Sequence, residues 1–207
     1  MRGIGGSKGP LKNITLHDLA NDIARVIEFI ADSPVHVLGW AFGNRVTRCL
    51  AEDHPLIVKS VILLAAGGKI PPSPEALKNL TKLYNKNISN KERFEAAKLS
   101  LFSPTTDSET VNNAMKHGRS WPEAVAAHSK ANQLTLLSEW WNGGQATMLV
   151  IQGLDDLIAL PENGQILKNQ FGERVRLINI ENAGHYMHAE QPKTIANSII
   201  AFLSDFR

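Results

Sequence analysis

The sequence predicts an α/β fold with a mostly parallel sheet, helices on both sheet faces and one helical insertion. Four short apolar runs, at 35–38, 58–66, 146–153 and 175–180, read as strands. The run at 58–66 is almost continuously apolar, which is typical of a strand covered by helices on both faces. Helix-like segments separate the runs, an alternation that favours a parallel sheet with active residues at the carboxyl ends of its strands.

The first helix is expected to begin after Thr15, with Thr15 as N-cap and Asp18 completing a capping box. It should end before Pro34. The first strand then runs into Gly39-Trp40-Ala41-Phe42-Gly43, after which a helix-like pattern continues to His54-Pro55. This layout is that of the nucleophile elbow G-x-S-x-G, a strained strand-to-helix turn whose two glycines relieve backbone crowding. Ala41 occupies the serine position, so the elbow lacks its nucleophile.

A stretch without convincing strands separates the second and third apolar runs. From Glu75 to about Trp141 the pattern is helix-like and more polar, which we interpret as a cap inserted into the core. The expected organisation is therefore an elbow-bearing core part at 1–70, a helical cap at 71–144 and a second core part at 145–207. Helices are expected at about 163–170 and from about Gln191 onward.

Composition excludes several classes of function. Of the 207 residues, 43% are hydrophobic and 20% charged, with a net charge of +2, which is ordinary for a globular protein and gives no basic stripe for nucleic acid. No apolar run approaches the length of a membrane span. The single Cys49 cannot form an internal disulfide and has no metal-ligand companion in the sequence pattern. We therefore expect no metal and a reducing, cytoplasmic location.

Two later turns carry candidate catalytic groups. Asp155 and Asp156 follow the strand that ends at Gly153, and an acid there can fix the tautomer of a histidine. We favour Asp156, with Asp155 as the alternative. His185 follows the last strand and is the expected general base, and His188 is the nearby competitor. We expect the remaining histidines to lie on the surface or in the cap, namely His17, His54, His117 and His128, or to pack within a strand, namely His36.

Together these motifs resemble the α/β-hydrolases, the superfamily of small esterases, lactonases and haloperoxidase-like enzymes. The resemblance rests on residues 2–7, 39–43, 153–161 and 184–192 and covers essentially the whole chain. It implies a triad at positions Ala41, Asp156 and His185, an oxyanion donor at the Phe42 N–H, and no organic cofactor. Its implied ligand is a small acyl ester or lactone; the substrate and the oligomeric state stay open.

Two departures from the family pattern indicate an inactive or nearly inactive chain. The Ala41 methyl group cannot attack a carbonyl, and the first strands of the family sheet, with one oxyanion donor, have no counterpart here. The strand from Val35 is then expected to be a hydrophobic edge. The alternatives are a hydrolase altered at its nucleophile, by nature or by engineering, a non-catalytic ligand-binding homologue, and a truncated gene fragment. Trp40, Trp140 and Trp141 would line the ligand site, or equally anchor the cap by packing.

Overall fold

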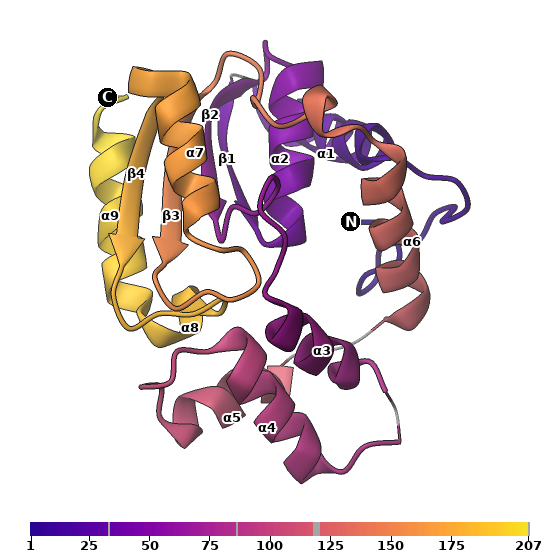
Figure 1. Ribbon diagram of the computed structural model, residues 1–207. Helices are drawn as coiled ribbons and strands as arrows, with labels where there is room; N and C mark the ends of the chain where they lie inside the picture. The colour runs from indigo at the N-terminus through magenta and orange to yellow at the C-terminus, as the bar shows by residue number, and fades with distance from the viewer. Residues whose placement is uncertain (33, 86, 118–120, 207) are drawn as a thin grey trace. The chain divides into compact units, whose positions relative to one another are not determined.

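The computed structural model describes residues 1–32, 34–85, 87–117 and 121–206. These residues form two compact units, Met1–Leu63 with Arg119–Met148 and Leu64–Gly118 with Leu149–Arg207. The four strands are β1 (Val35–Trp40), β2 (Val58–Leu64), β3 (Thr147–Gly153) and β4 (Val175–Ile180), and all four coincide with predicted apolar runs (Figure 1). They form one parallel sheet in the order β1-β2-β3-β4, so the α/β prediction is confirmed.

In the first unit, α1 (Leu16–Ile30) packs against α2 (Phe42–Asp53), and α2 packs against β1. The predicted capping box is present, because Thr15 accepts the backbone N–H of Asp18 and Asp18 accepts that of Thr15. The buried stripe of α1 includes Leu16, Leu19 and Ile27. The unit also contains α6 (Pro122–Leu134) and the 3₁₀ turn η1 (Leu137–Glu139). Strand β1 continues two residues beyond the predicted run, which brings Gly39 into the strand.

Helices dominate the second unit. Three of them, α3 (Pro74–Leu83), α4 (Asn90–Leu101) and α5 (Ser108–His117), lie in the stretch predicted to be helical. A core of Ala97, Leu101, Phe102 and Val111 packs among them, and Phe94 lies against it. After β3 follow α7 (Glu162–Phe171), which packs on β4, and η2 (Gly172–Arg174). The chain continues through α8 (Met187–Glu190) and α9 (Pro192–Ser204). No helix in the described ranges is both long and apolar enough to cross a membrane.

Candidate active site

The turn between β1 and α2 has the strained geometry of a nucleophile elbow. Ala41 sits at φ 53° and ψ −116°, a left-handed backbone conformation that non-glycine residues adopt at a cost of about 1–3 kcal/mol. A Cβ on Gly39 would lie 2.5 Å from the carbonyl oxygen of Gly43 and from Oγ1 of Thr47, so only glycine fits there. The local fold is therefore built to present the side chain of residue 41, which here is a methyl group.

The expectation that both elbow glycines relieve crowding is correct for Gly39 and wrong for Gly43. A Cβ built on Gly43 meets no described atom within 4 Å outside its chain neighbours and the nearby backbone of its own helix. The asymmetry arises because the Cα–H of Gly39 points toward the backbone of α2, whereas that of Gly43 points into open space. Crowding at the elbow therefore constrains Gly39, on the strand side of the turn, and does not constrain Gly43.

Phe42, the predicted oxyanion donor, begins α2. Its backbone N–H belongs to the first helical turn, where amide groups lack intrahelical acceptors. Its ring stacks on His128 of α6, with centroids 5.2 Å apart and planes 6° from parallel. His128 belongs to the predicted cap stretch but is buried, and a ring nitrogen bonds the Arg2 carbonyl oxygen at 3.1 Å. Burial lowers the pKa of His128, which favours the neutral ring.

In the second unit, Asp156 and His185 come together as predicted. The His185 Nδ1 lies 3.0 and 3.1 Å from the two carboxylate oxygens of Asp156, and both side chains are buried. Asp156 Oδ1 also accepts the backbone N–H groups of Ile158 and Ala159 at 2.8 Å each. The carboxylate therefore holds a proton on Nδ1 and leaves Nε2 as the basic nitrogen of the ring.

The adjacent Asp155 has a different partner. Its Oδ2 accepts the Ser103 hydroxyl at 2.6 Å, and its backbone N–H donates to the Ala183 carbonyl at 3.0 Å. The competitor His188 stacks on Tyr186 at 5.4 Å, and burial together with nearby His185 lowers its pKa. The geometry thus pairs Asp156 with His185, and Asp155 holds the turn.

Two glycines let the backbone around His185 approach its neighbours closely, and one glutamate fixes this turn by hydrogen bonds. A Cβ on Gly153 would lie 2.3 Å from the Ala183 carbonyl oxygen, and one on Gly184 would lie 2.7 Å from backbone atoms of Phe102. The Glu190 carboxylate accepts the backbone N–H groups of Gly184 and Ser103 at 2.7 Å each. Glu190 lies in the stretch 184–192 that resembles the α/β-hydrolases, but no sequence pattern indicates this anchoring contact.

Two of the three tryptophans expected to line a ligand site pack around a buried arginine. Trp140 and Trp141 are buried around Arg48 of α2, whose guanidinium carbon lies 4.5 and 4.9 Å from their ring centroids. Arg48 is fully buried and donates to Asn44 Oδ1 at 2.6 Å. Burial and neighbouring Arg45 lower its pKa well below the usual value. These contacts favour the packing alternative for both rings. Trp40 is half-buried at the end of β1.

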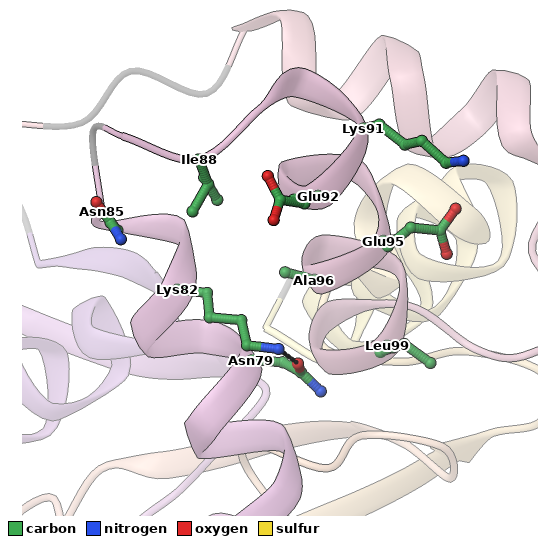
Figure 2. A pocket seen from close by; sticks show the side chains of 9 residues that line it. All are labelled: Asn79, Lys82, Asn85, Ile88, Lys91, Glu92, Glu95, Ala96 and Leu99. Atoms are coloured by element: carbon green, nitrogen blue, oxygen red, sulfur yellow. Dashed lines mark hydrogen bonds between the residues drawn. The ribbon is translucent and has the colours of Figure 1, made fainter.

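A hollow of about 450 Å³ lies between α3 and α4 (Figure 2). Most of its lining residues carry polar or charged groups, but the atoms that face the hollow are mainly apolar. Lys82 Nζ donates to Asn79 Oδ1 at 3.1 Å within it. None of the predicted site residues lines this hollow. The predicted site residues therefore fall into two groups, Ala41 with Phe42 in the first unit and Asp156 with His185 in the second.

The surroundings of Cys49 differ from the expectation. We expected no metal-ligand companion for Cys49, but the first unit places His17 and Asp53 beside it. The contact with His17 follows from no compact sequence motif, since His17 precedes Cys49 by 32 residues. Spacing alone could have indicated Asp53, which lies one helical turn from Cys49.

Comparison with known proteins defines the class. The family model described as "alpha/beta hydrolase fold" matches residues 1–192, and the chain belongs to this family. No curated protein matched the sequence. The structure is similar to a Mycobacterium tuberculosis protein provisionally named a non-heme bromoperoxidase, with a TM-score of 0.81 and 24% identity, over 100% of this chain and 80% of that one.

Two further solved structures share the fold. A thermophilic esterase from Thermogutta terrifontis has a TM-score of 0.75 and 20% identity, covering 99% of this chain and 78% of its own. A meta-cleavage product hydrolase from Pseudomonas fluorescens was solved as a serine-to-alanine mutant with acetates. Its TM-score is 0.78 at 16% identity, and the match covers 100% of this chain and 78% of that one. At these identities the likeness establishes the fold.

Proposed function

We propose that this chain is an ester- or lactone-hydrolase homologue whose nucleophile position is occupied by Ala41, with Asp156 as the acid and His185 as the base. The observation that carries the proposal is the buried Asp156–His185 pair, with Nδ1 3.0 Å from the carboxylate. The positive φ of Ala41 at a strand-to-helix turn supports an elbow at the nucleophile position. The three positions follow in the chain order of this fold family, nucleophile, acid, histidine.

With serine at position 41, the chemistry would be acyl transfer. The hydroxyl oxygen would attack the substrate carbonyl as His185 Nε2 takes its proton, and the Phe42 N–H would donate to the developing oxyanion. His185 would return the proton to the leaving alcohol, and water would then release the acyl group. With Ala41, no acyl intermediate forms, and His185 has only a water molecule to activate. Removing the serine from a protease with this triad lowers turnover by about 10⁶.

The test is to restore the hydroxyl with Ala41→Ser. We expect hydrolysis of short p-nitrophenyl esters at least about 10³-fold above the unaltered chain, together with covalent labelling by a serine-directed phosphonate seen as a mass increase. Adding Asp156→Asn to this variant should lower turnover by up to about 10⁴, because the amide favours the wrong tautomer of His185. Adding Asp155→Asn is the matched control and should leave the rate within a few-fold.

A folded Ala41→Ser protein that neither hydrolyses the esters nor takes up the phosphonate would overturn the proposal. Equal effects of Asp155→Asn and Asp156→Asn would also contradict the assignment of the acid.

The second candidate function is ligand binding without catalysis. It is favoured by Ala41, because a methyl group at the nucleophile position cannot attack a bound ester. The probe is a panel of short acyl esters and lactones added to the unaltered chain. Binding would raise the melting temperature with ligand concentration, and a ligand at 100 times its Kd stabilises a protein by about 2.7 kcal/mol. A shift that His185→Gln abolishes would support binding at the proposed site. No shift with any member of the panel would count against it.

A further inference from the structure

Outside the proposed hydrolase site, three potential metal ligands meet in the first unit. The His17 Nδ1 lies 2.7 Å from Asp53 Oδ2 and 3.4 Å from Cys49 Sγ, and the thiol sulfur lies 3.5 Å from the same Asp53 oxygen. A thiol, an imidazole nitrogen and a carboxylate oxygen therefore form a small triangle. None of the three has a role in the proposed hydrolase chemistry.

The local fold determines this arrangement. Cys49 and Asp53 are four residues apart on α2, which places them on one helix face. His17 lies in the first turn of α1, where the Thr15–Asp18 capping box fixes the helix start, and α1 packs against α2. The donors thus come from two regular helices, which hold side chains more precisely than loops do.

A fourth side chain orients the histidine. The second ring nitrogen of His17, Nε2, lies 3.1 Å from Glu139 Oε2 in η1. Glu139 is itself held by the backbone N–H of Leu136. A carboxylate that accepts the far N–H of a ligating histidine is the usual outer partner of a metal-bound imidazole, because it fixes the tautomer and strengthens the ligand.

The donor set selects the ion. Thiolate, imidazole and carboxylate are the three protein ligands of zinc, whose bonds to them are about 2.0–2.3 Å long. Around a tetrahedral ion such bonds separate the donor atoms by about 3.3–3.6 Å. The distances from Cys49 Sγ to His17 Nδ1 and to Asp53 Oδ2 already lie in this range. The distance between His17 Nδ1 and Asp53 Oδ2 has to increase by about half an ångström. Hard ions such as Mg²⁺ avoid thiolate.

We propose that His17, Cys49 and Asp53 bind a zinc-class divalent ion, with Glu139 as the positioning residue for His17. His17 and Asp53 are 33% and 24% exposed at their side chains, so the ion can enter from solvent and complete its coordination with water. Cys49 is buried beneath them. Without an ion, burial and the Asp53 carboxylate raise the pKa of the Cys49 thiol, and ion binding displaces its proton.

The test uses Co²⁺ as a spectroscopic probe on the unaltered chain. Cys49 is the only cysteine of the chain, so a thiolate-to-cobalt charge-transfer band can arise at no other residue. We expect this band in the near ultraviolet, with visible absorption of tetrahedral intensity, at one equivalent of Co²⁺. Added Zn²⁺ should abolish both, and Mg²⁺ should have no effect.

Variants assign the ligands. Cys49→Ser should remove the charge-transfer band, and His17→Gln or Asp53→Asn should weaken Zn²⁺ binding strongly. Glu139→Gln keeps every ligand and should weaken binding by about 10–100-fold. The matched control is His54→Gln, which removes a nearby histidine that bonds Asn21 and should leave binding unchanged. Circular dichroism checks that each variant is folded.

Absence of the cobalt band in the folded unaltered chain would overturn the proposal. His17, Cys49, Asp53 and Glu139 would then form a hydrogen-bond network that binds no metal. A band that persists in Cys49→Ser would also overturn the proposal. Neither result bears on the ester-hydrolase proposal, which the serine variant tests separately.

Discussion

Of the two glycines in the elbow, only Gly39 is required by close backbone approach. A methyl group on Gly39 would lie 2.5 Å from backbone and side-chain atoms of α2, whereas one on Gly43 meets none. We expect Gly39→Ala to destabilise the protein by about 1–3 kcal/mol or more, since the backbone must move. Gly43→Ala should be neutral or stabilising by up to about 1 kcal/mol, because alanine restricts the unfolded chain. Urea unfolding of the pair measures both, and equal losses would contradict the asymmetry.

A second prediction at the residue scale concerns His128. Burial lowers the pKa of His128 in the folded protein below the ordinary value of 6.5. At a pH between the folded-state and unfolded-state pKa values, the unfolded chain therefore binds more protons than the folded protein. Stability should therefore rise with pH through this window and be lost as the pH falls below about 6.5. His128→Phe keeps a ring against Phe42 and should flatten this part of the profile. Unfolding free energies of both proteins at several pH values test it; parallel profiles would refute it.

At the scale of elements, the sequence predicted the strands, the Thr15 capping box and the elbow turn, because these depend on local patterns. It could not separate Asp155 from Asp156 with certainty. Both lie in one turn, and their side chains diverge because Asp156 accepts two backbone N–H groups, whereas Asp155 accepts the Ser103 hydroxyl. The packing of Trp140 and Trp141 around Arg48 was also beyond its reach. That contact joins residues about 90 positions apart and depends on how α2 meets η1.

The histidine turn gives the prediction at this scale. The Glu190 carboxylate accepts two backbone N–H groups, from Gly184 and Ser103, and the Thr106 hydroxyl. We expect Glu190→Gln to destabilise the protein by about 1–3 kcal/mol, since charge-assisted bonds become neutral and one amide group faces donors. The control Glu173→Gln alters a fully exposed carboxylate and should stay within about 0.5 kcal/mol. Chemical unfolding compares them, and equal effects would count against an anchoring role.

At the scale of the whole molecule, β1 ends the strand order among the described residues. Leu38 on this strand is 48% exposed, and a hydrophobic edge invites pairing with another chain. We expect concentration-dependent self-association that Leu38→Lys reduces. Leu77→Lys is the matched control, because Leu77 is also 48% exposed but lies on helix α3. Light scattering over a concentration series checks this; a chain that stays monomeric throughout, or equal effects of both lysines, would contradict it.

The division into two compact units also separates the chain's intrinsic chromophores. All four tryptophans, at 40, 121, 140 and 141, belong to the first unit, and both tyrosines, Tyr84 and Tyr186, belong to the second. Tryptophan emission therefore follows the melting of the first unit alone, whereas far-ultraviolet dichroism follows the helices of both. Because one sheet contains strands of both units, we expect the two signals to change at the same denaturant concentration. Separate midpoints would show that each unit melts independently.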